Sequence, residues 1–116
     1  MKNLFLILKT KYPAIVWTVI IFILCTMPSK DLPNIHDKTA HFAVFAIFSF
    51  LWIFSTKKSG QVLIFGAIYG ILIEFWQGTL PENFHRSFDW YDALADAIGG
   101  IIGYIFYKII FRLFPV

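Results

Sequence analysis

The sequence predicts an all-α membrane protein in which four transmembrane helices form one small bundle. Of its 116 residues, 59% are hydrophobic and 15% are charged, whereas soluble domains contain about 45–50% apolar and about 25% charged residues. Four stretches contain no charged residue, namely 12–29, 42–56, 59–73 and 97–107. With their polar ends they extend to roughly 17–20 residues each, enough to cross a hydrocarbon core of about 30 Å. This composition disfavours a soluble domain and excludes a disordered chain.

The helices are expected at residues 12–27, 37–56, 60–77 and 89–111. Pro28 follows the first helix, and proline ends helices because it lacks the backbone N–H. Residues 57–60 form a tight turn, and residues 78–88, which include Pro81, form the longest loop. The length allows one domain that spans residues 1–116. Because the number of spans is even, both termini are expected on the same side of the membrane.

The basic residues predict the orientation of these helices. Seven lie at one end of the bundle: Lys2, Lys9, Lys11, Lys57, Lys58, Lys108 and Arg112. Three lie at the other end: Lys30, Lys38 and Arg86. Cytoplasmic loops carry an excess of Lys and Arg, so both termini are predicted to be cytoplasmic in a multi-pass protein of the cell membrane.

All acids and histidines fall in the opposite, outward half of the predicted bundle. They are Asp31, Asp37, Glu74, Glu82, Asp89, Asp92, Asp96, His36, His41 and His85. Chemistry or recognition of a polar ligand is therefore expected at the outer face. The inner half lacks comparable polar residues, which disfavours a transport pathway.

Two further classes of function are disfavoured by charge and cysteine content. The net charge is +3, but the basic residues are scattered in ones and twos and form no basic face, so no nucleic-acid partner is expected. Cys25 is the single cysteine and lies within an apolar run. A disulfide framework and a cysteine-based metal site are therefore excluded.

Two helices carry residues that are expected to face the bundle interior. In the last helix, a 3,4,3,4 spacing places five residues on one stripe: Asp89, Asp92, Asp96, Gly99 and Gly103. The third helix has its own GxxxG pattern at Gly66 and Gly70. Because small residues let helix backbones approach closely in lipid, we expect the third and fourth helices to touch through these four glycines.

If the glycine stripes face inward, polar side chains converge in one pocket below the outer interface. The candidate members are Asp37, Lys38, His41, Glu74, Gln77, Arg86, Asp89, Asp92 and Asp96. Asp96 lies roughly 10 Å below the start of the last helix, where a carboxylate is costly unless it is paired, solvated or protonated. Two other interpretations stay open. Asp37 and Asp89 fit helix N-caps, and the deeper residues fit a polar lock between helices.

The same residues resemble the pattern of the VanZ-like family. The matching segments are Asp37-Lys38-x-x-His41, Glu74-x-x-Gln77, Arg86-x-x-Asp89-x-x-Asp92 and Gly99-Gly100-x-x-Gly103, within residues 28–103. Family members usually carry asparagine at the position of Asp96. The resemblance implies a small bacterial membrane protein, and the namesake of the family is associated with resistance to teicoplanin, a lipid-bearing glycopeptide antibiotic.

Two functions are compatible with these observations. The first is an enzyme or binding site for an amphipathic envelope molecule, in which carboxylates with a nearby His and Arg hold a divalent cation, a proton, or the headgroup of a lipid, cell-wall precursor or glycopeptide. No nucleophile stands out, since Ser87 lacks an activating partner, and the histidine spacing matches no zinc signature. The second is a noncatalytic membrane factor that acts through protein or antibiotic interaction. Besides the lipid bilayer as a partner, the sequence specifies no cofactor, resident metal or oligomeric state.

Overall fold

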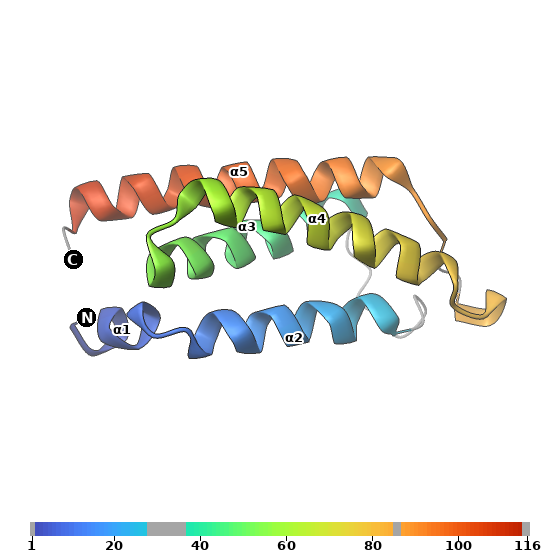
Figure 1. The fold of residues 1–116 in the computed structure, drawn as a ribbon, viewed down its shortest axis with the longest axis horizontal. Helices are drawn as coiled ribbons and strands as arrows, with labels where there is room; N and C mark the ends of the chain where they lie inside the picture. The colour runs from blue at the N-terminus through green and yellow to red at the C-terminus, as the bar shows by residue number, and fades with distance from the viewer. Residues whose placement is uncertain (1, 28–36, 85–86, 115–116) are drawn as a thin grey trace.

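The computed structural model describes residues 2–27, 37–84 and 87–114, and within these residues it contains helices and no strand (Figure 1). The elements are α1 (Lys2–Lys9), α2 (Tyr12–Thr26), α3 (Asp37–Thr56), α4 (Ser59–Gly78), the 3-10 helix η2 (Glu82–Phe84) and α5 (Trp90–Leu113). The four predicted helices correspond to α2, α3, α4 and α5, with ends that differ by at most two residues. The all-α prediction is therefore confirmed.

Three of the helices are long and apolar enough to cross a membrane by themselves. They are Lys38–Thr56, Ser59–Gly78 and Trp90–Leu113. The first predicted span differs, because α2 has only 15 residues and meets the same criteria only together with α1, from which it is bent by 66°. The described residues thus contain three candidate membrane spans, or four if this bent pair crosses as one.

The break between α1 and α2 has a local cause in the sequence. Pro13 lies in the first turn of α2, where a proline is tolerated because its missing N–H would have no partner in the helix. A continuous helix would place the proline ring against the carbonyl of Lys9, so the chain bends instead. Helix α1 was not among the predicted elements, although Phe5 stacks on Phe54 of α3 at a centroid distance of 5.9 Å.

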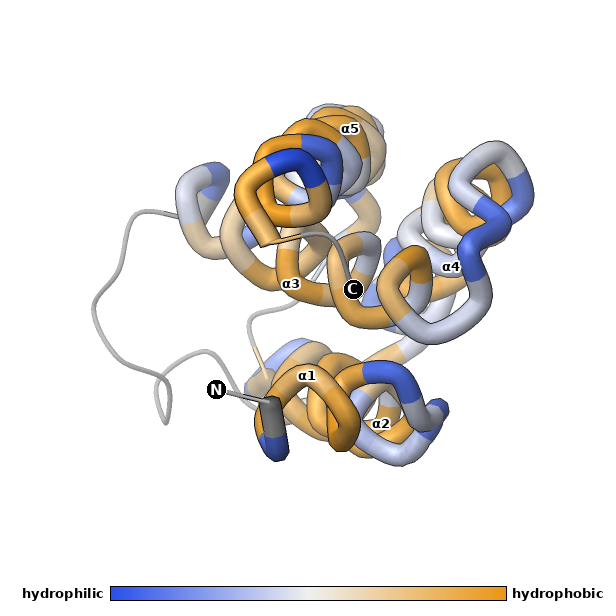
Figure 2. Tube along the Cα trace, turned by 90° about the vertical axis from the view of Figure 1, so that its left-hand side faces the viewer, coloured by the Kyte–Doolittle hydropathy of each residue, from blue (hydrophilic) through white to orange (hydrophobic). Residues whose placement is uncertain are grey.

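Helices α3, α4 and α5 pack together, and α1 and α2 lie along one side of this group (Figures 1 and 2). The contact between α3 and α5 is the most extensive one. Hydrophobic residues dominate the helices in Figure 2, which views the molecule from the end that carries α1. Many large apolar side chains face outward, including Ile64, Phe65 and Ile105. Such a surface is suited to lipid.

The glycines pack differently from the prediction. A Cβ on Gly99 would lie 2.6 Å from the carbonyl oxygen of Phe42, and a Cβ on Gly103 would collide with that of Ala46. Both contacts are with α3, so the expected pairing of the two GxxxG patterns is wrong. Gly70 does face α5, where it lies against Asp96, whereas Gly66 lies against Phe48 of α3. The pattern identifies a close-approach face but not the helix that occupies it.

Hydrogen bonds from side chains attach α2 to the other helices. Trp17 Nε1 donates to the carbonyl oxygen of Val44 at 2.9 Å, and Tyr69 Oη donates to that of Thr18 at 2.8 Å. The hydroxyl of Thr18 accepts from Trp52 Nε1 at 2.9 Å. Thr18 therefore joins α2 to both α3 and α4, and its isolation within an apolar run was the only sequence signal for this role.

Candidate functional site

Six of the predicted pocket residues lie together where α3, α4 and the start of α5 meet. This polar cluster consists of Lys38, His41, Glu74, Asp89, Asp92 and Asp96. Lys38 and His41 come from α3, Glu74 comes from α4, and the three aspartates come from α5 and its N-cap. The cluster is at the end of the bundle opposite α1 (Figure 1).

Two linked sets of contacts connect the side chains of the cluster. Lys38 Nζ donates to Asp89 Oδ2 at 3.1 Å and also to Asp92 Oδ1. His41 Nδ1 lies 2.5 Å from Asp96 Oδ1, and its Nε2 lies 3.7 Å from Asp92 Oδ2. Asp92 therefore stands between the ammonium group of Lys38 and the imidazole of His41.

Three of the four carboxylates in the cluster are almost fully withdrawn from solvent, whereas Asp89 is partly exposed. The exposed fraction is 0% for Glu74, 1% for Asp96 and 8% for Asp92. A charged carboxylate removed from water costs several kcal/mol unless it is paired or hydrogen-bonded. Glu74, Asp92 and Asp96 belong to helices that are long and apolar enough to cross a membrane, and ionisable groups in such helices commonly mark functional sites.

Within the part of the chain that the structure describes, Glu74 has one satisfied and one unsatisfied carboxylate oxygen. Its Oε1 accepts a hydrogen bond from the backbone N–H of Asp89 at 3.2 Å. Its Oε2 is buried and has no hydrogen-bond partner within residues 2–27, 37–84 and 87–114. Each of His41, Glu74 and Asp96 presents one potential ligand atom, and these atoms all lie within 4.8 Å of one another. The arrangement has the donor types and the proximity of a metal-binding group.

Asp89 is the N-cap of α5, which confirms the capping prediction for this residue. Its carboxylate accepts from the backbone N–H of Tyr91 at 2.8 Å. This hydrogen bond, followed by the contact with Lys38, lowers the pKa of the Asp89 carboxyl below its ordinary value. A cap that also binds Lys38 fixes the start of α5 against α3, and so positions Asp92 and Asp96.

Two glycines make room for the ligand-type side chains. A Cβ on Gly70 would lie 2.9 Å from both Cβ and Oδ2 of Asp96, so only glycine allows α4 to pass this carboxylate at the observed distance. A Cβ on Gly99 would lie 3.2 Å from the backbone oxygen of His41. The glycine stripes therefore contribute to the geometry of the polar cluster as well as to helix packing.

Three predicted members of the pocket are not among the six residues of the cluster. Gln77 is buried, but its Nε2 donates to the backbone oxygen of Cys25 at 3.0 Å and so joins α4 to α2. Arg86 and the side chain of Asp37 lie outside the described residues. The membership of these three residues in a ligand site stays a prediction.

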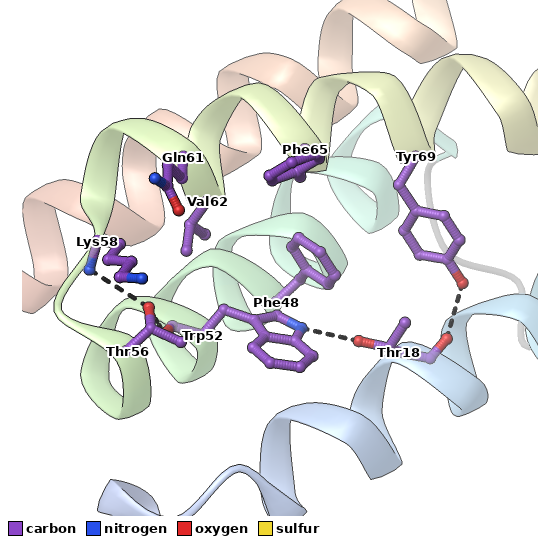
Figure 3. A pocket seen from close by; sticks show the side chains of 9 residues that line it. All are labelled: Thr18, Phe48, Trp52, Thr56, Lys58, Gln61, Val62, Phe65 and Tyr69. Carbon is purple, nitrogen blue, oxygen red and sulfur yellow. Dashed lines mark hydrogen bonds between the residues drawn. The ribbon is translucent and has the colours of Figure 1, made fainter.

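A separate cavity of about 320 Å³ lies between α2, α3 and α4, nearer to the α3–α4 turn (Figure 3). Its lining is mainly apolar and consists of Thr18, Phe48, Trp52, Thr56, Lys58, Gln61, Val62, Phe65 and Tyr69. In Figure 3 the polar atoms of Thr18, Trp52 and Tyr69 bond to one another rather than to the interior of the cavity. None of the predicted site residues lines it, so this cavity is distinct from the polar cluster.

The fold and the polar cluster together define a small helical membrane protein with ionisable side chains buried at one end of its bundle. The family model described as VanZ/LLP1 matches residues 9–112. The chain belongs to the VanZ-like family, as the motifs in its sequence predicted. No curated protein and no solved structure matches the chain.

Proposed function

We propose that this VanZ-like membrane protein binds the polar headgroup of an amphipathic envelope molecule at the polar cluster. The single observation that carries the proposal is Glu74, a carboxylate with 0% exposure whose Oε2 has no hydrogen-bond partner among the described residues. An unsatisfied buried polar atom costs about 1–3 kcal/mol, and more if it is charged. Stability alone disfavours such a group, whereas a ligand site requires an atom that is free to bind.

The surroundings of the polar cluster favour an amphipathic ligand. Phe75 and Trp90 are exposed beside it, and both pack on Phe88, at centroid distances of 4.9 Å and 4.7 Å. Aromatic side chains of this kind gather where the hydrocarbon region meets the headgroups. A molecule anchored by apolar chains could therefore lie against these rings while its headgroup reaches Glu74.

A structural lock is the second candidate function of the cluster, and specific contacts favour it. Lys38 joins two aspartates of the α5 N-terminus to α3, and His41 contacts Asp96. If these contacts serve only to hold the bundle, the protein acts through another surface as a noncatalytic factor. Removal of one partner from a buried pair then costs about 3–5 kcal/mol, because the other partner is left uncompensated.

The variants Glu74→Gln and Asp92→Asn distinguish these two functions. A ligand site predicts that both variants keep or raise the thermal midpoint in detergent and lose bound amphiphile, because each removes a buried charge. We would measure lipid retained after extraction from nanodiscs of phosphatidylethanolamine and phosphatidylglycerol, by native mass spectrometry. Teicoplanin, a lipid-bearing glycopeptide, serves as a second probe in the same assay.

Glu82→Gln is the matched control, because Glu82 is an exposed acid near the same end of the bundle. It should alter neither the thermal midpoint nor the retained lipid. A loss of lipid that always accompanies an equal loss of folded protein in Glu74→Gln and Asp92→Asn would decide for the lock.

A further inference from the structure

We infer that His41, Glu74 and Asp96 form a binding site for a divalent transition-metal ion, with Zn²⁺ as the best-fitting one. This inference deepens the proposed function and rests on it, because it concerns the same polar cluster. It names the group to which a headgroup would attach.

The donor atoms are already close to the spacing that a metal ion requires. Zinc binds imidazole nitrogen and carboxylate oxygen at roughly 2.0–2.2 Å, so two ligand atoms on one tetrahedral ion lie about 3.4 Å apart. The atoms offered by His41, Glu74 and Asp96 lie within 4.8 Å of one another. To reach this spacing, His41 Nδ1 and Asp96 Oδ1, which lie 2.5 Å apart, separate by about 1 Å, and the most distant pair of donors comes closer by at most about 1.4 Å.

The imidazole of His41 has an aspartate near each of its two nitrogens. Its Nδ1 points to Asp96 Oδ1 at 2.5 Å, and its Nε2 faces Asp92 Oδ2 at 3.7 Å. When a metal-bound histidine presents its second nitrogen to a carboxylate, that carboxylate fixes the tautomer and strengthens the ligand. Asp92, itself bound by Lys38, occupies the place of this carboxylate. The metal would then take Nδ1 and replace the proton between His41 and Asp96.

Glu74 provides the observation that is independent of the other contacts. Glu74 comes from α4, whereas His41 comes from α3 and Asp96 from α5. Its side chain is fully buried, and its Oε2 lacks a hydrogen-bond partner among the described residues. A bound cation would satisfy this oxygen. It would also reduce the repulsion between Glu74 and Asp96, which are the two buried carboxylates of the group.

The chemistry of the donors selects the class of ion. One nitrogen and two oxygens suit zinc, whereas Mg²⁺ and Ca²⁺ prefer sites made entirely of oxygen. Three protein ligands leave a fourth tetrahedral position open, as in catalytic zinc sites. An oxyanion of a headgroup, such as phosphate or carboxylate, is the ligand class that fits this position.

The test uses the full chain purified in detergent and stripped of metal with EDTA, with Zn²⁺ as the probe. We expect one Zn²⁺ per chain to remain after desalting, as measured by mass spectrometry of the metal, and Zn²⁺ to raise the thermal midpoint. Asp92→Asn should lower the affinity about 10–100-fold, as is typical when an orienting partner of a ligand is lost. Glu74→Gln and Asp96→Asn should lower it further, measured by competition with a fluorescent chelator.

Glu82→Gln and Cys25→Ser are the controls and should bind Zn²⁺ like the unchanged chain. X-ray absorption at the zinc edge keeps the inference testable if a cluster variant does not fold, because it requires only the unchanged protein. The expected spectrum has one imidazole and otherwise oxygen ligands. Sulfur ligation, or Zn²⁺ binding that Glu74→Gln leaves unchanged in folded protein, overturns the inference, as does selective binding of Mg²⁺ or Ca²⁺. Because no amphiphile is needed, a negative lipid assay and a negative zinc assay are separate results.

Discussion

Asp89 connects the capping of one helix to the charge pattern of the polar cluster. Its carboxylate accepts from Tyr91 N and from Lys38 Nζ, and the pKa of the carboxyl is lowered, first by the backbone bond and then by the ammonium group. A lowered pKa in the folded state means that these contacts stabilise the protein above the ordinary carboxyl pKa of about 3.9. The stabilisation is lost as the pH falls through the lowered value.

The variants Asp89→Asn and Asp89→Ala separate the two contacts. Asparagine caps a helix as well as aspartate does, so Asp89→Asn should lose only the charge interaction with Lys38. We expect its thermal midpoint to fall less steeply than that of the unchanged chain below about pH 4. Asp89→Ala should have a lower midpoint than Asp89→Asn at neutral pH, because it also loses the cap. Circular dichroism melts across this pH range provide the measurement, and equal midpoints for both variants would contradict a capping role.

The sequence predicted which side chains form the cluster better than it predicted their contacts. Spacing along α5 placed Asp92 and Asp96 on one face, and the outward acids and histidines indicated the end of the bundle. The contact between His41 and Asp96 could not be predicted, because it depends on the rotation of α3 against α5. Gln77 illustrates the same limit, since its position one turn from Glu74 does not reveal that its amide reaches Cys25 O.

At the scale of helices, α3 is the element that the glycine patterns did not identify. A GxxxG pattern indicates that a helix face permits close approach, but any neighbouring helix can use that face. Here α3 passes over Gly99 and Gly103, and Ser49 Oγ of α3 donates to the carbonyl oxygen of Gly100 at 2.7 Å. This hydrogen bond satisfies the buried hydroxyl of Ser49 and fixes the register of α3 against α5.

Gly103→Ala should therefore destabilise the bundle strongly. Its Cβ would collide with the backbone oxygen of Ala46, and a backbone atom cannot rotate away as a side chain can. We expect a loss that exceeds the about 1–3 kcal/mol typical of overpacking by a side chain, measured by unfolding in detergent. Gly60→Ala is the matched control, because nothing lies within 4 Å of the position of its Cβ. An unchanged stability for Gly103→Ala would contradict the close contact between α3 and α5.

For the whole molecule, composition and charge-free stretches predicted the limits of α2, α3, α4 and α5 to within two residues, but they predicted neither α1 nor the shortness of the first apolar helix. In lipid, the backbone N–H and C=O groups find no water to bond, and a helix satisfies them by hydrogen bonds within its own segment. Pro13 lies in the first turn of α2, directly after the bend that separates α1 from α2. A proline near the start of an apolar run is compatible with both a straight span and a bent one. Helix packing does not determine which end of the bundle faces the cytoplasm; the distribution of Lys and Arg does.

The orientation is therefore tested by labelling. Helix α1, the α3–α4 turn and the C-terminal end of α5 lie at one end of the molecule (Figure 1), and most of the Lys and Arg side chains belong to these segments. The excess of basic residues predicts that this end is cytoplasmic and that the polar cluster is at the outer face. In a Cys25→Ser background, Glu82→Cys should react with an impermeant thiol reagent on intact cells. Ser59→Cys should react only after permeabilisation, and its labelling on intact cells would place the polar cluster at the cytoplasmic face instead.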